Sequence, residues 1–145
     1  MSFKPTLRTI LLTGALSLVA ASAIARSAAL IEPQRTEIVT LDNTKATTPT
    51  QVRRAIILGG ARHGWKPIAD KPGVLTLNLS TREHEVTVDV LYDAHGFQVK
   101  FRSSANLNEQ KSGDRITIHP KVNQWLSALN EDIRSAAVSG GGQSN

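Results

Sequence analysis

The chain has 145 residues, which is enough for one ordinary domain but not for two separate cores. It contains no cysteine, and this excludes disulfides, thiolate metal sites, a cysteine nucleophile and a lipidated N-terminal cysteine. Its net charge of +5 is spread along the chain without a basic cluster, so the composition gives no indication of nucleic-acid binding.

The first 25 residues have the three parts of a secretory signal peptide. Lys4 and Arg8 form the positive start, residues 10–20 are apolar, and the Ala-Ile-Ala sequence ending at Ala25 fits the cleavage pattern, with 21–23 as an alternative. We therefore expect export to a bacterial periplasm and cleavage after Ala25. Both lost charges are positive, so the net charge falls from +5 to +3. The apolar run is short for a spanning helix, so only an uncleaved segment would hold the protein at a membrane.

Composition divides the remaining chain into three parts. Residues 26–47 are expected to form a flexible leader with a possible edge strand at 35–41. Residues 48–138 carry the periodic patterns of a single α+β domain. Residues 139–145 are rich in glycine and serine and have nothing to pack, so this tail is expected to be disordered.

A first helix is predicted from residue 48 onward. Thr48 can cap it, Pro49 occupies the first helical position, and Gln51 completes a capping box. Gly64 is the expected left-handed residue that ends this helix, and Trp65 follows where it can fold back on the last turn.

Two glycines, Gly59 and Gly60, lie inside this predicted helix. Each costs about 1 kcal/mol relative to alanine in a helix interior. We expect the compensation to be a close approach of the helix backbone to the sheet. The glycine spacing does not match a phosphate-binding loop, and the capping box upstream favours a helix here.

Three segments, 75–79, 86–92 and 97–101, alternate apolar and polar residues with a period of two. This pattern predicts half-buried antiparallel strands joined by turns at 80–83 and 93–96, with Gly96 supplying a positive φ. One register of the second hairpin aligns the apolar residues of both strands on one face. Its cross-strand pairs are Tyr92–Phe97, Val90–Val99, Val88–Phe101 and, on the polar face, Asp89–Lys100.

The C-terminal part is predicted to contain a polar loop at 106–115, a short strand at 116–118 and a helix that Pro120 opens. The apolar stripe of this helix consists of Val122, Leu126, Leu129, Ile133 and Ala136. The resulting order is (β)-α-β-β-β-α. We therefore predict a two-layer α+β sandwich, with a three- to four-stranded antiparallel meander and both helices on one face.

Several phrases of the sequence occur in a recognisable order. They are Arg-His-Gly-Trp at 62–65, the three-strand meander, Ser-Ser-Ala-Asn-Leu at 103–107, and the Ile-His-Pro-x-x-Asn-x-Trp phrase at 118–125 followed by Leu129 and Ile133. Over residues 48–136 the chain resembles a family of small exported bacterial proteins, many of them lipoproteins. That family has no established activity, so the resemblance supports fold and location only. This chain differs from the lipidated relatives in having no cysteine.

Metal and cofactor sites are not indicated. The four histidines, His63, His84, His95 and His119, do not lie at ligand spacing, and no carboxylate cluster joins two of them. A zinc site needs three or four convergent ligands, so we expect solvated or capping histidines and no metal or cofactor.

A hydrolase is an alternative that the strand register raises. The register places His84 on the inner row, diagonal to Ser103, and a histidine beside a serine can act as base and nucleophile. The sequence offers neither a nucleophile elbow nor an evident orienting carboxylate. We therefore predict a protein that is not an enzyme.

A binding surface is the remaining hypothesis. Tryptophan and arginine are typical interface anchors, but for Trp65 we favour the alternative that it closes the core beneath the helix end. The candidate binding residues are Arg62, His63, Trp65, Ser103, Ser104, Asn106 and Asn123.

We accordingly expect a monomeric binding module that contacts an envelope protein or a cell-wall component. An inhibitor or immunity protein, which would bind a secreted toxin or enzyme through a protruding loop at 105–115, is a second hypothesis.

Overall fold

The computed structural model describes residues 27–39 and 47–140. The expected signal peptide lies outside these residues, as does most of the expected tail, of which only 139 and 140 are described as the end of a helix. Neither helix in the described part of the chain combines the length and the apolar composition that a membrane span requires.

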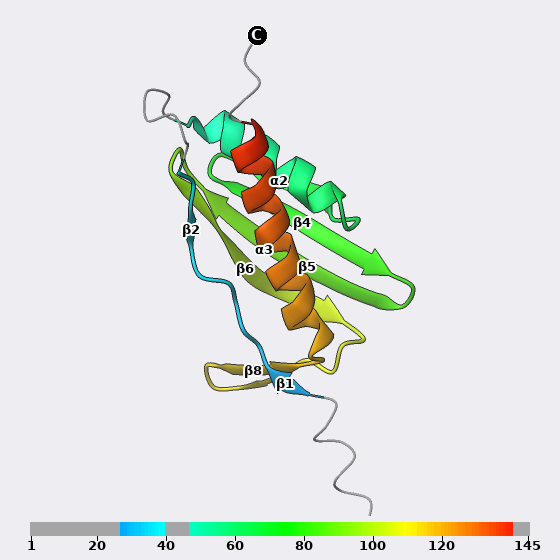
Figure 1. Ribbon diagram of the computed structural model, residues 1–145. Coiled ribbons are helices and arrows are strands. Elements are labelled where there is room, and N and C mark those ends of the chain that lie inside the picture. Colours follow the sequence, from blue (N-terminus) through cyan, green and yellow to red (C-terminus); the bar gives the residue numbers. More distant parts are fainter. Residues whose placement is uncertain (1–26, 40–46, 141–145) are drawn as a thin grey trace, which may run out of the picture.

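Two helices cover one face of a five-stranded antiparallel sheet, which confirms the α+β sandwich (Figure 1). The strand order of this sheet is β2-β6-β5-β4-β3, and a second sheet has the order β1-β8-β7. The helices are α2 (Pro49–Ala61) and α3 (Lys121–Gly140). The strands are β1 (Ala28–Ala29), β2 (Thr36–Glu37), β3 (Lys66–Lys71), β4 (Val74–Thr81), β5 (His84–Tyr92), β6 (Gly96–Ala105), β7 (Gln110–Ser112) and β8 (Arg115–Ile118).

The predicted ends of the first helix are confirmed. Thr48 caps α2 and forms the capping box with Gln51. At the other end the N–H of Gly64 donates to the carbonyl of Ala61 at 3.2 Å, and the N–H of Trp65 donates to Gly60 at 3.0 Å. These two bonds form a Schellman motif, and Gly64 has the expected left-handed φ of 84°.

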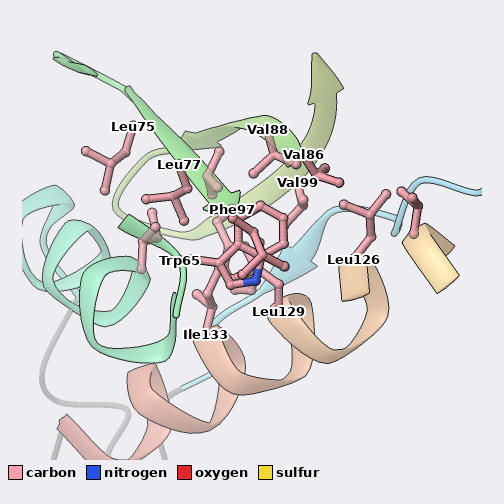
Figure 2. Close-up of a cluster of buried hydrophobic side chains, with 14 of the residues drawn as sticks. Trp65, Leu75, Leu77, Val86, Val88, Phe97, Val99, Leu126, Leu129 and Ile133 are labelled. Atoms are coloured by element: carbon pink, nitrogen blue, oxygen red, sulfur yellow. The ribbon is translucent and has the colours of Figure 1, made fainter. Parts of the chain in front are cut away.

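The core lies between the sheet and the two helices (Figure 2). All four predicted pairs of the β5–β6 hairpin are present, and they bring the apolar rows of β4, β5 and β6 onto the helical face. The α3 stripe expected from the sequence is buried against these rows. Gly96 is not among the residues with positive φ, so its predicted role in the turn is wrong.

Glycine at position 59 sets the distance between the helices. A Cβ on Gly59 would lie 2.6 Å from the Cα of Ile133 in α3, closer than any ordinary contact. A Cβ on Gly60 would lie 3.3 Å from the side chains of Leu77 and Trp65. The predicted close approach to the sheet therefore describes Gly60, whereas Gly59 permits close approach to the other helix.

Three elements differ from the expected order. Strand β3 was not anticipated, and it pairs with β4 through a turn in which Gly73 has a φ of 79°. The expected polar loop at 106–115 contains β7, which forms a hairpin with β8. The prediction of a flexible leader is wrong for residues 27–39, because β1 pairs with β8 and β2 with β6. The strand at 36–37 does lie within the predicted edge strand.

Replacing Gly59 with alanine tests the close helix approach. We expect Gly59→Ala to lower the free energy of unfolding by up to about 2 kcal/mol, because overpacking costs about 1–3 kcal/mol and the better helix propensity of alanine returns about 1 kcal/mol. Gly140→Ala is the matched control, since a Cβ there would have no neighbour within 4 Å. Urea denaturation of both variants measures the difference, and equal stabilities would contradict the close packing.

Candidate functional site

Arg62 and His63 come together over a carboxylate of α3. The Nδ1 atom of His63 lies 2.5 Å from Oδ2 of Asp132, and an Arg62 guanidinium nitrogen lies 3.7 Å from the other oxygen. The side chains of Arg62 and His63 are 47% and 60% exposed, whereas that of Asp132 is 18% exposed. We call these three residues the α2–α3 corner. One partly buried carboxylate thus contacts two more exposed basic side chains at the surface.

A shallow hollow of about 350 Å³ adjoins this corner. Glu131 and Arg134 pair across one turn of α3 in its wall, and hydrogen bonding to the guanidinium lowers the pKa of the Glu131 carboxyl. Val138 adds an exposed apolar side chain. The lining residues are Arg62, Glu131, Asp132, Arg134, Ser135, Val138 and Ser139. The hollow therefore carries both signs of charge and one apolar contact.

Trp65 does not belong to this surface. It is 3% exposed and lies in the core, where Figure 2 shows it among Phe97, Leu129 and Ile133. The Schellman motif explains this position, because its two hydrogen bonds turn the chain back under the last turn of α2. An exposed anchor at Trp65 is therefore wrong, and the alternative of a core tryptophan is correct.

The serine–histidine pair of the hydrolase hypothesis does not form. A β-bulge between Thr87 and Val88 shifts the register of β5 and β6 by one residue. Ser103 therefore lies opposite Thr87 on the polar face, whereas His84 belongs to the row of the other face. The imidazole of His84 donates instead to the carbonyl of Asn106 at 2.9 Å, so the two side chains cannot cooperate.

Ser104 and Asn106 hold the chain that leads to the β7–β8 hairpin. The hydroxyl of Ser104 donates to Glu109 at 2.8 Å, and its backbone N–H donates to the same oxygen. The side-chain amide of Asn106 donates to the carbonyl of Glu83, while Asn106 itself has a positive φ of 59°. Both side chains form hydrogen bonds within the fold, so they have little hydrogen-bonding capacity left for a ligand.

Asn123 binds the N-terminal segment of the domain. Its Oδ1 accepts the N–H of Ile31 at 2.9 Å, and its Nδ2 donates to the carbonyl of Ala29 at 2.8 Å. The amide thus pairs with an extended backbone as a neighbouring strand would. We call residues 27–39, which run from the small sheet to the edge of the large one, the strap (Figure 1).

The strap is also held by charged and polar side chains. The carboxylate of Glu32 accepts Nζ of Lys100 at 2.6 Å and the N–H of Phe101 at 2.8 Å. Arg35 donates to both oxygens of Asp93 at 2.9 Å. Hydrogen bonds from the backbone of His95 and from Arg35 lower the pKa of Asp93 below its ordinary value of 3.8. Sequence reasoning missed these pairs because their members are about 60 residues apart.

The histidine side chains that form hydrogen bonds in the structure bind other parts of the fold. Besides His63 and His84, His119 accepts the N–H of Lys121 at 3.2 Å and so caps the start of α3. Over residues 27–39 and 47–140, no three histidine or acidic side chains converge as a metal site would require.

Comparison with known proteins gives no relative from which to assign a role. The chain matches no family model, and neither a curated protein nor a solved structure matches it.

Removing the side chain of Asn123 should release the strap. In Asn123→Ala we expect faster hydrogen exchange of the strap amides, with the local opening free energy lowered by about 1 kcal/mol for the lost hydrogen bonds. Gln124→Ala, an exposed neighbour on the same helix, is the control. Native-state hydrogen exchange measures both, and unchanged exchange of Ile31 in Asn123→Ala would exclude the clamp.

Low pH should weaken the contact between Asp93 and Arg35 of the strap. Because the folded state lowers the pKa of Asp93, its stabilising contribution is complete above the unfolded value and disappears as the pH falls through the folded value. We expect the urea midpoint to decline below about pH 4, and Asp93→Asn to decline less because it has already lost this contribution. Asp114→Asn, at the exposed tip of the β7–β8 hairpin, should follow the wild type. Identical pH profiles of all three proteins would refute this role.

Proposed function

We propose that this protein is an exported binding module of the bacterial envelope and that it contacts a partner through the α2–α3 corner. The observation that carries the proposal is the arrangement of Arg62 and His63, two exposed donors held on Asp132 beside a hollow. Export is supported by the sequence of residues 1–25 alone. The resemblance over residues 48–136 agrees with this location.

Holding these side chains in place favours binding. A mobile arginine loses rotamer freedom when a partner immobilises it, and this loss reduces affinity. Asp132 contacts His63 at 2.5 Å and forms a longer ion pair with Arg62 at 3.7 Å, yet about half of each of these two side chains is exposed. The corner is therefore organised before a partner arrives, and Arg62 is of the residue type that dominates interfaces.

The lining of the hollow indicates a protein partner. Arg134 and Glu131 place opposite charges one turn apart, and Val138 is 46% exposed beside them. A partner that complements this surface needs both signs of charge and an apolar contact, which a folded protein surface supplies more readily than a repetitive glycan. We therefore favour an envelope protein over a cell-wall polymer.

The β7–β8 hairpin supports a second candidate function, that of an inhibitor or immunity protein. All three residues of β7 are exposed, and Gly113 in its turn has a φ of 59°. The hairpin lies at the end of the molecule opposite the start of α2 (Figure 1). A protruding hairpin of this kind can enter the cleft of an enzyme, so the two candidates use different surfaces.

Site-specific crosslinking distinguishes these surfaces. A photoreactive amino acid is placed in the full chain, expressed in its own cells, at Ser135 in the hollow, at Asp114 on the hairpin or at Gln98 on the polar face of the sheet. We expect one crosslinked partner at Ser135, several-fold weaker when Arg62→Ala is added because the pre-positioned anchor is lost. Denaturing electrophoresis and mass spectrometry identify the product.

Arg54→Ala removes the same charge from the exposed side of α2 and should leave the crosslink unchanged. A partner captured only at Asp114 would favour the inhibitor function. Crosslinking that is confined to Gln98, or that is insensitive to Arg62→Ala, would reject the corner as the binding site.

A further inference from the structure

The surface that holds the strap is built to bind an extended backbone. The edge of β8 pairs with β1, the edge of β6 pairs with β2, and Asn123 pairs with the strap backbone at the end of β1 and just after it. A further N–H, that of Ile38, donates to the carbonyl of His95 at 2.8 Å. Addition of a strand to an exposed sheet edge is a general mode of peptide recognition. We call these edges together with Asn123 the acceptor surface.

Side chains make the acceptor surface specific for this segment. Lys100 meets the carboxylate of Glu32, and Asp93 meets the guanidinium of Arg35. Further along, the side chains of Thr36 and Asn130 exchange hydrogen bonds of 3.1 and 3.3 Å. The matched positions run in order along the strap, so a segment with the same charges in the same order is the occupant that fits.

Glycine at position 96 leaves room for the strap backbone. A Cβ on Gly96 would collide with the carbonyl oxygen of Thr36 and would approach Cα of Glu37 to 3.3 Å. Gly96 is buried although it begins a strand at a turn. Its lack of a side chain is therefore required by the docked strap, and not by the turn itself.

Few apolar contacts keep the strap in place. Leu30 and Ile38 pack partly against the core, whereas Ile31 and Val39 are 66% and 73% exposed. Most of the remaining contacts are hydrogen bonds and exposed ion pairs, which water can replace. Segments with few buried apolar contacts open at a lower free energy than the core. The strap can thus leave while the helices and β3–β6 stay folded.

We propose that the acceptor surface is an interaction site that residues 27–39 of a second copy of this chain can occupy in trans. Exchange keeps every contact described above, so it changes mainly the effective concentration of the strap, which favours the monomer in dilute solution. The exchanged form increases with protein concentration. The acceptor surface is separate from the α2–α3 corner, so this proposal can be correct or wrong independently of the proposed function.

The absence of natural cysteine allows a direct test. Ala29 and Thr117 lie opposite each other in the β1–β8 ladder, at a separation that a disulfide spans. Differently tagged full-length Ala29→Cys and Thr117→Cys proteins are mixed, held at high concentration and oxidised. We expect a disulfide-linked heterodimer whose yield increases with concentration. Ala29→Cys mixed with Lys71→Cys, at the exposed opposite edge of the sheet, is the control.

If Ala29→Cys forms no more disulfide-linked heterodimer with Thr117→Cys than with Lys71→Cys, the proposal is overturned. The double variant Ala29→Cys/Thr117→Cys provides a second measurement, because its internal disulfide closes the acceptor surface. A fluorescent synthetic peptide of residues 27–39 should bind this variant when it is reduced and not when it is oxidised, as fluorescence anisotropy measures. Equal binding in both states, or no binding in either, also overturns the proposal.

Discussion

The contact between the backbones of α2 and α3 at Gly59 determines the arrangement of the whole helical face. Because Gly59 has no side chain, α2 approaches the Cα of Ile133 directly, and Ala55 continues the contact with Ala136 and Ala137. The helices can then share the same face of the sheet above one continuous core. The position of Asp132 beneath the end of α2 follows, since it precedes Ile133 in sequence. The α2–α3 corner is thus a geometric consequence of small residues at a helix crossing.

The strap has an equally direct effect on the polar side of the sheet. The register alone suggests an ion pair between Asp89 and Lys100, which do lie opposite each other. In the structure Lys100 binds Glu32 of the strap instead, and Asp89 binds Thr76 at 2.7 Å and Arg102 at 3.2 Å. The ion pair between Asp89 and Lys100 does not form, because the strap supplies the carboxylate of Glu32, which also accepts the backbone N–H of Phe101. Long-range docking therefore decides which partner a charged side chain takes.

Local patterns predicted the helices, the three central strands and the hairpin register, because side-chain periodicity and capping depend on neighbouring residues. Strand β3 had no such pattern: Pro67 interrupts it and all six residues are exposed. The bulge after Thr87 adds one residue to the opposite strand without a signal in the sequence, and this single shift separates Ser103 from His84. The strap depends on contacts between distant segments. Of the candidate site, Arg62 and His63 were predicted, whereas Asp132 was one of many polar residues on a helix surface.

Short polar residues and long charged residues contribute to this fold in different ways. Ser104, Asn106 and Asn123 form a candidate binding cluster in the sequence, yet all three are used inside the fold. Asn106 and Asn123 bind backbone groups, and the hydroxyl of Ser104 donates to the carboxylate of Glu109, which also accepts the backbone N–H of Ser104. A buried or half-buried backbone group without a partner is costly, and a short amide or hydroxyl can supply that partner with little loss of side-chain freedom. Arginine and histidine at a helix end are longer and keep donors free after one contact. In a domain without disulfides, the short polar residues therefore fasten the chain, whereas the longer side chains of Arg62 and His63 stay about half exposed while they contact Asp132.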